Sequence, residues 1–278
     1  LALSPTPSTA HSANSLSTAA LSAAISRARE LSLHERKEWL RLVHYSRKTF
    51  GGYESQADGI NFFVSPHGKV DPKLELEATI QGFFSTEKRK LEGQGQPEQS
   101  VRCQFPARFE WLNRELALES EIPVQDCPLF EEFRARTATK SVTLVFSSFY
   151  VANPSSAFGH SLIRLNKSDG SNGTEHFQLL DYGVNYAAAA NVANPLIYTV
   201  YGLTGMFKGA FSNIPYHYKV REYADFQSRD VWEYDLTLTP DETAQIVRHI
   251  WELGSTYFDY YYLTENCSYH MLTLLEAA

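Results

Sequence analysis

The stretch LTENCSY, residues 263–269, places an asparagine and then a cysteine at the expected start of a helix. Asparagine is a preferred N-cap residue, so Asn266 would cap this helix and leave Cys267 in its first turn. The partial positive charge of a helix N-terminus favours a thiolate over a thiol. Backbone N–H groups of the first turn are also unpaired and able to hold an oxyanion. The stretch therefore predicts a nucleophilic cysteine at position 267.

A second stretch, AFGHSLIRL, residues 157–165, places His160 at the head of an expected strand. The glycine before it permits a close backbone approach or unusual dihedral angles. An imidazole can take up and return the proton of a thiol, so His160 is the predicted base for Cys267. His176, on the next expected strand, is a competing base. Each residue also has a purely structural interpretation, a small buried side chain for the cysteine and a hydrogen-bonded histidine at position 160.

A catalytic histidine needs an acceptor that orients its ring. If the strand after His160 forms a hairpin with the expected strand 177–184, the residue opposite the histidine lies near position 180. Asp181 is the polar residue closest to that register, and we predict it as the third catalytic residue. Asn185 stays open as a second candidate for the same role.

The composition limits the class of protein. The chain has 278 residues, of which 43% are hydrophobic and 21% charged, as expected for a globular protein with a substantial core. Its net charge of -7 argues against nucleic acid as a partner. An odd number of cysteines predicts a disulfide between Cys103 and Cys127 in an oxidising compartment, with Cys267 left free. Neither a metal nor a cofactor is expected, because no metal-binding spacing of cysteine and histidine occurs.

The order of patterns along the chain predicts an α+β protein. A Ser/Thr/Ala-rich segment, 1–15, is expected to be disordered or to lie next to a removed signal peptide. Residues 16–135 are expected to be mostly helical, with a capping box at Ser32–Glu35. Residues 136–278 are expected to form a thiol domain, in which a small antiparallel sheet packs with the helix that carries the cysteine. Its expected strands are 142–146, 161–165, 177–184, 216–223 and 231–238, and its other helices are 195–207 and 240–253. The helical pattern still runs at the last residue, which suggests a domain excised from a longer protein.

The order of the two site residues, histidine first and cysteine last, resembles the circularly permuted papain-like group. That group includes the lecithin–retinol acyltransferases and related phospholipid-dependent N-acyltransferases. Three stretches look more closely like the periplasmic domain of Lnb-type proteins, a family that includes bacterial lipoprotein N-acyltransferases. These are NPSSAFGH (153–160), LLDYGVNYAA (179–188) and ENCSY (265–269), and 50–53, 216–223 and 229–234 resemble it too.

The resemblance implies a permuted papain-like core and a periplasmic enzyme associated with the inner membrane. In such an enzyme, Cys267 would take a fatty acyl group from a phospholipid, and the N-terminal amine of a lipoprotein would then accept it. His160 would deprotonate first the thiol and then the amine. The expected partners are therefore the phospholipid donor, the lipoprotein N-terminus and the membrane surface. The main alternative is a cysteine peptidase or amidase acting on cell-wall peptides, and a second is a non-enzymatic scaffold that keeps the papain-like shape.

Overall fold

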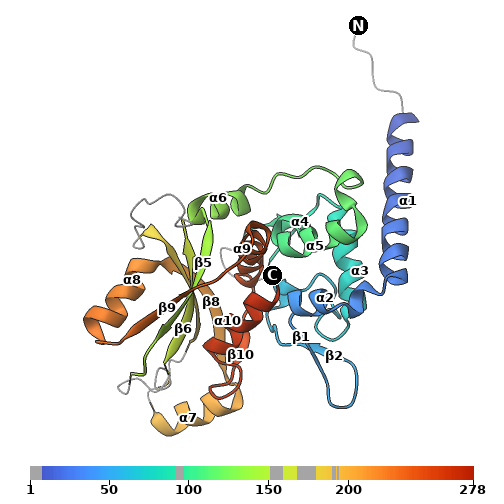
Figure 1. Cartoon of the computed structure of the whole chain (residues 1–278). Coiled ribbons are helices and arrows are strands. Elements are labelled where there is room, and N and C mark those ends of the chain that lie inside the picture. The colour runs from blue at the N-terminus through green and yellow to red at the C-terminus, as the bar shows by residue number, and fades with distance from the viewer. Residues whose placement is uncertain (1–7, 92–96, 151–158, 168–179, 190–191, 193) are drawn as a thin grey trace. The chain divides into compact units, whose positions relative to one another are not determined.

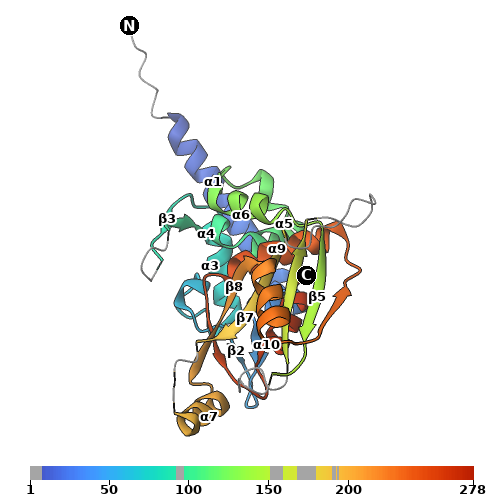
Figure 2. The same ribbon diagram turned by 90° about the vertical axis from the view of Figure 1, so that its left-hand side faces the viewer.

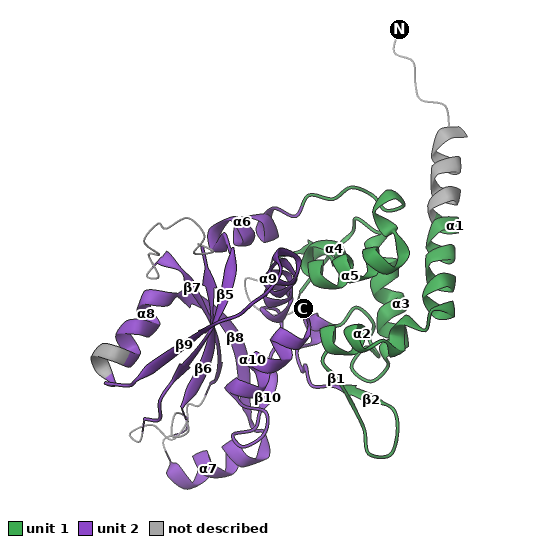
Figure 3. Ribbon diagram, viewed as in Figure 1, with its two compact units in different colours: residues 1–54, 63–126 green, residues 55–62, 127–278 purple. Residues whose placement is uncertain are grey.

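The computed structural model describes residues 8–91, 97–150, 159–167, 180–189, 192 and 194–278, with the backbone alone described for 8–17 and 224–226. The protein is α+β, as predicted, and divides into two compact units (Figures 1 and 3). Unit 1 runs to Glu54 and continues over Phe63–Asp126, and unit 2 holds Ser55–Phe62 and Cys127–Ala278. Each unit has its own buried core, so each is described by itself below.

Unit 2 begins at Cys127 and not at the predicted residue 136, because helix α6 (Pro128–Thr137) packs within this unit. The ring of Phe133, on α6, lies 5.4 Å from that of Trp251, on helix α9 (Pro240–Leu253). Residues 55–62 join the same unit because the N–H of Asp58 donates to the carbonyl of Tyr257 at 2.9 Å.

Unit 1 is mostly helical, as predicted. The expected capping box at Ser32 is wrong: Ser32 adopts a left-handed φ of 49° and caps nothing with its side chain. The chain is still helical on both sides of Ser32, with one helix ending at Glu30 and a 3₁₀ turn beginning at Leu33. Helix α1 also begins at Ser8, within the segment 1–15, whose residues 1–7 lie outside the described range. The elements of unit 1 are α1 (Ser8–Glu30), η1 (Leu33–Glu35), α2 (Lys37–Leu42), β1 (Tyr45–Arg47), β2 (Tyr53–Ser55, its last residue in unit 2), α3 (Pro72–Phe83), β3 (Lys88–Arg89), β4 (Gln99–Ser100), α4 (Val101–Gln104), α5 (Pro106–Leu116) and η3 (Leu118–Ser120).

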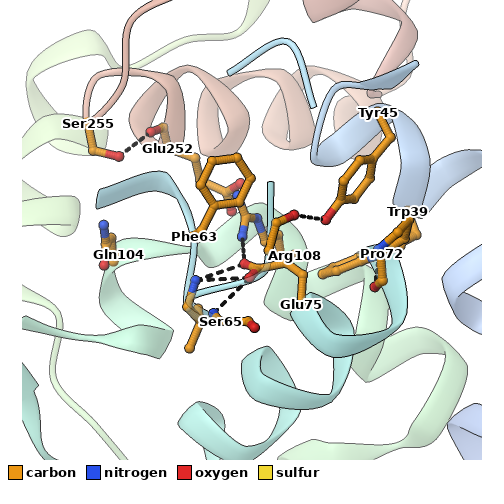
Figure 4. Close-up of polar contacts among 12 residues, drawn as sticks. Trp39, Tyr45, Phe63, Ser65, Pro72, Glu75, Gln104, Arg108, Glu252 and Ser255 are labelled. Atoms are coloured by element: carbon orange, nitrogen blue, oxygen red, sulfur yellow. Dashed lines mark hydrogen bonds and ion pairs between the residues drawn. The ribbon is translucent and has the colours of Figure 1, made fainter. Parts of the chain in front are cut away.

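A buried ion pair lies in the core of unit 1 (Figure 4). The guanidinium of Arg108 donates to the carboxylate of Glu75 at 2.9 Å, and both side chains are fully buried. The backbone N–H of Ser65 donates to the same carboxylate at 2.8 Å. A buried charge requires such partners, so this arrangement fixes helices α3 and α5 and the loop before α3 relative to one another.

Unit 2 is built on a six-stranded antiparallel sheet in the order β10-β8-β7-β6-β5-β9. Helices α9 and α10 cover one face of this sheet, and α8 with a π-helical turn, η6, covers the other (Figures 1 and 2). The strands are β5 (Ser141–Ser147), β6 (His160–Asn166), β7 (Tyr182–Ala188), β8 (Phe207–Pro215), β9 (Val231–Asp235) and β10 (Phe258–Tyr260); the remaining elements are η2 (Ile60–Phe62), α7 (Pro195–Thr204), α8 (Tyr216–Val220), η6 (Arg221–Phe226) and α10 (Cys267–Glu276).

The predicted strand 216–223 is wrong, since this segment forms α8 and the start of η6. Its aromatic residues favour a strand by propensity, but Pro215 ends β8 and stands at the N-cap of α8. Tyr216 and Tyr223 then lie seven residues apart on a helical segment, and both belong to a buried cluster with Val145 and Leu162 of the sheet. The partner of β9 is therefore β5, and the predicted pair of 216–223 with 231–238 does not form.

Candidate active site

Cys267 is the first residue of α10, and Asn266 is its N-cap. The side-chain oxygen of Asn266 accepts hydrogen bonds from the N–H groups of Ser268 at 3.1 Å and Tyr269 at 3.3 Å. The cap therefore uses two of the first-turn N–H groups that the sequence led us to expect unpaired. Among the described residues, no acceptor occupies the N–H of Cys267, which leaves that group for an oxyanion.

The Cys267 thiol is buried, with an exposed fraction of 6%. Burial raises the pKa of this thiol, but a hydrogen bond and the positive charge of the His160 imidazole lower the pKa further than burial raises it. The N–H of Ser161 and the hydroxyl of Ser268 add to the lowering, and the resulting pKa is about 7, against an ordinary value of 9.0. About half of the thiol is therefore ionised at neutral pH, which makes it a competent nucleophile.

His160 is held at the head of β6 by the backbone around it. Gly159 has a φ of +96°, which favours glycine over residues with a side chain. A Cβ at this position would come within 2.8 Å of the carbonyl oxygen of Ser147 on the neighbouring strand. Both reasons given for a glycine before the histidine, close approach and unusual dihedral angles, are thus confirmed.

The side chain that orients His160 is Asn185, the second candidate from the sequence. The Nε2–H of His160 donates to the Oδ1 of Asn185 at 2.5 Å, which leaves the other ring nitrogen, Nδ1, for the thiol. Asn185 on β7 pairs with Leu162 on β6, and Leu162 lies on the same face of its strand as His160. The amide is therefore a diagonal neighbour of the imidazole within the sheet.

Asp181, our first choice for this role, lies elsewhere. Its Oδ1 accepts a hydrogen bond from the N–H of Lys167 at 2.9 Å, and its Oδ2 is 3.7 Å from the Nε of Arg164. The predicted register is wrong: Asn185, not a residue near 180, is the one that lies beside the head of β6. His176, the competing base, lies outside the described residues, as do residues 153–158 of the first resembling stretch.

Two further side chains beside the thiol were not predicted as site residues. The ring of Tyr223, on η6, lies edge-on to the imidazole of His160 with their centroids 6.3 Å apart. Burial raises the pKa of this phenol, and its hydroxyl has no hydrogen-bond partner among the described residues. Arg229 holds the phenol from the other side, with its guanidinium 4.9 Å from the ring centre. The only sequence signal for the pair was that both lie within stretches that resemble Lnb-type proteins.

The remaining cysteines do not compete with Cys267. Cys103 and Cys127 are disulfide-bonded, whereas Cys267 is a free thiol. His270, three residues after the free cysteine, is a core residue whose ring lies 4.1 Å from that of Tyr186. Across the described part of the chain, no group of three or more histidine, cysteine, aspartate or glutamate side chains could hold a metal ion.

A family model described as the Lnb N-terminal periplasmic domain matches residues 129–278, more than half of the chain. The chain belongs to this family. The match confirms the resemblance drawn from the sequence stretches, and it covers His160, Asn185 and Cys267 together. Membership of the Lnb family assigns the domain to the periplasm.

A second model, a domain of unknown function (DUF7843), matches residues 31–115, which belong mainly to unit 1. Neither the curated proteins nor the solved structures contain a match to the chain. Within the described residues, no helix has the length and apolar character needed to cross a bilayer.

Proposed function

We propose that this Lnb-family domain is a thiol acyltransferase associated with the inner membrane. It would move a fatty acyl group from a phospholipid, through a thioester on Cys267, to the N-terminal amine of a lipoprotein. The observation that carries the proposal is the hydrogen-bonded series of thiol, imidazole and amide, Cys267–His160–Asn185, with a thiol pKa of about 7. The same three groups act in papain-like enzymes, where the amide orients the histidine.

In the first half-reaction, the thiolate of Cys267 attacks the ester carbonyl of the phospholipid and forms a C–S bond. The oxyanion that develops accepts a hydrogen bond from the Cys267 N–H. The buried hydroxyl of Tyr223 has no partner among the described residues, and its ring lies 6.3 Å from the imidazole of His160, so we propose it as a second donor. The C–O bond then breaks, and the departing alkoxide takes the proton held by His160. The products are a lysophospholipid and the acylated thiol.

In the second half-reaction, the amine of the lipoprotein attacks the thioester carbonyl. His160 removes a proton from the amine as the C–N bond forms, and the thiolate leaves. An amide and the free enzyme result, so atoms and charges balance over the cycle. Burial of the sulfur supports transfer over hydrolysis, because a thioester at a site with an exposed fraction of 6% is shielded from water.

The proposal is tested by intact-protein mass spectrometry after incubation with a phospholipid in detergent micelles. We expect one acyl group per chain, removed by neutral hydroxylamine and absent from Cys267→Ala. Cys267 is the only free thiol of the chain, so the adduct has a single possible thioester site. Addition of a synthetic diacylglyceryl-cysteine peptide should then discharge the thioester and acylate the peptide amine.

Two results would contradict the proposal. No adduct from phospholipid, together with an adduct from a cell-wall peptide, would favour the peptidase or amidase. Release of free fatty acid at the same rate with and without the acceptor peptide would show a hydrolase in place of a transferase.

A further inference from the structure

Helix α7 (Pro195–Thr204) exposes nearly all of its apolar side chains. Gly202 is its only buried residue, and Leu196 has an exposed fraction of 75%. Figures 1 and 2 both show α7 beyond the end of the six-stranded sheet of unit 2. From residue 182 to residue 207 the sequence contains no charged side chain, although 21% of the whole chain is charged. We call the exposed residues of this segment the α7 patch: Leu196, Ile197, Val200, Leu203 and Met206.

Several polar groups of α7 are paired within the protein. The two threonine hydroxyls turn back onto the helix: Thr199 donates to the carbonyl of Pro195 at 2.8 Å, and Thr204 to that of Val200 at 2.7 Å. At the N-terminus, the side chain of Asn194 accepts hydrogen bonds from the first two N–H groups after Pro195. At the C-terminus, the N–H of Gly205 donates to a carbonyl of the helix. Such caps and threonine bonds are common in soluble helices, but they also mean that these groups would not be left unpaired in hydrocarbon.

The patch is connected to the active cysteine through one residue. The N–H of Tyr262 donates to the carbonyl of Gly202 at 2.8 Å, and the carbonyl of Tyr262 accepts from the amide of Asn266 at 3.2 Å. Asn266 is the cap of the helix that begins with Cys267. Close packing supports the same connection, because a Cβ on Gly205 would overlap the ring of Tyr261.

We infer that the α7 patch docks on a phospholipid bilayer and so brings the acyl donor to Cys267. Delivery of an acyl donor rests on the proposed function, whereas binding of the patch to a bilayer does not require catalysis. The residue types favour lipid over a protein partner: the patch is aliphatic, whereas the centres of protein interfaces are enriched in aromatic residues and arginine. The tyrosines stand where α7 meets the rest of the unit, with the ring of Tyr198 5.2 Å from that of Phe207. Tyrosines in this position are typical of the interfacial zone of a membrane.

Docking is measured on the Cys267→Ala variant of the 278-residue chain, so that acyl transfer plays no part. The probe is vesicles of phosphatidylcholine with a minor fraction of phosphatidylglycerol, and the readout is flotation of the protein with the vesicles. The test variant adds Leu196→Glu and Val200→Glu. The matched control is Val124→Glu, because Val124 is an exposed valine of unit 1. Leu196→Phe keeps the patch apolar and shows whether substitution alone disturbs the helix.

We expect the partition coefficient to fall about a hundredfold for the double substitution, at roughly tenfold for each apolar side chain replaced. The control and Leu196→Phe should bind like the parent. Binding should persist at high salt, since apolar burial is not screened. Equal flotation of the double variant and its parent would overturn the inference, as would binding lost at high salt. Self-association through the patch without vesicle binding would overturn it in favour of a second copy of the chain.

Failure of docking and failure of the proposed function give different results. If the wild-type chain forms the thioester with micellar phospholipid but the patch does not bind vesicles, the docking surface is wrong and the function stands. If patch-dependent flotation occurs without any thioester, the surface stands and the chemistry is wrong.

Discussion

Replacing His160 by alanine tests whether this imidazole ionises the Cys267 thiol. Its hydrogen bond and charge are the main influences that lower the thiol pKa to about 7 against the opposing effect of burial. Without them we expect the thiol pKa to return near its ordinary value of 9.0. A rise of about two units, equivalent to about 2.7 kcal/mol, reduces the thiolate fraction at pH 7 from about half to about 1%, or about fiftyfold.

The assay is the rate of alkylation by iodoacetamide as a function of pH. It reports on Cys267 alone, because the other two cysteines are disulfide-bonded. A thiolate of higher pKa is the stronger nucleophile, with a Brønsted slope of about 0.4–0.5. A pKa that is higher by about two units therefore makes the thiolate itself react roughly tenfold faster. The variant should therefore react roughly five- to eightfold more slowly than the wild type at pH 7. At pH 10, where both thiols are ionised, it should react about tenfold faster.

The crossing of the two pH profiles is the decisive feature, provided that the variant keeps the circular dichroism spectrum and melting temperature of the wild type, because an unfolded chain would also carry a thiol of ordinary pKa. The matched control is His67→Ala, which removes an exposed histidine of unit 1 and should leave the midpoint near pH 7. A midpoint that stays near pH 7 in His160→Ala would refute the reasoning. The helix terminus and the serine donors would then suffice to ionise the thiol.

Two further pairs of substitutions test the structure around the site. Asn185→Ala should slow acylation of the thiol roughly tenfold or more, because the imidazole loses the hydrogen bond that orients it. Asp181→Ala should leave that rate unchanged. It should lower the free energy of unfolding by about 2 kcal/mol, because it removes a partner of the buried Arg164 side chain. Equal rate losses in the two variants would contradict the assignment of the orienting residue. Gly159→Ala should unfold at a lower temperature than Gly51→Ala. Both positions have a positive φ, but only at Gly159 would the new Cβ overlap neighbouring atoms. This overlap should lower the free energy of unfolding by a further amount of about 1–3 kcal/mol, as at other overpacked sites. Equal melting temperatures in calorimetry would show that this overlap is relieved without strain.

The parts of the site that the sequence predicted are those with local causes. The cap at Asn266, the helix start at Cys267 and the glycine before His160 each depend on residues adjacent in the chain. The α+β class likewise follows from the change of pattern along the chain. Helix α9 begins at Pro240 after the N-cap Thr239, and both the capping box and the proline can be seen in the sequence. Propensity and capping rules suffice where neighbours in sequence are also neighbours in space.

The parts that the sequence did not predict depend on long-range pairing. The sequence favours Asp181 over Asn185 only through an assumed hairpin register, and the observed pairing of Leu162 with Asn185 changes every cross-strand neighbour. The segment 216–223 was misassigned because its tyrosines suit a strand by propensity. The buried cluster that two of these tyrosines form with Val145 and Leu162 of the sheet is a long-range feature, which the local sequence does not show.

The two candidates for the orienting role, Asp181 and Asn185, differ in charge. The fold places only the neutral one, Asn185, in contact with His160. The carboxylate of Asp181 is matched by the guanidinium of Arg164, so its charge is balanced without the imidazole. The residue that contacts His160 is a neutral amide, which fixes the ring by a hydrogen bond and adds no charge. A carboxylate in its place would hold the proton on the imidazole more tightly and so hinder its delivery to a departing alkoxide. A neutral acceptor therefore suits a histidine that must both take a proton from the thiol and give it up within one turnover.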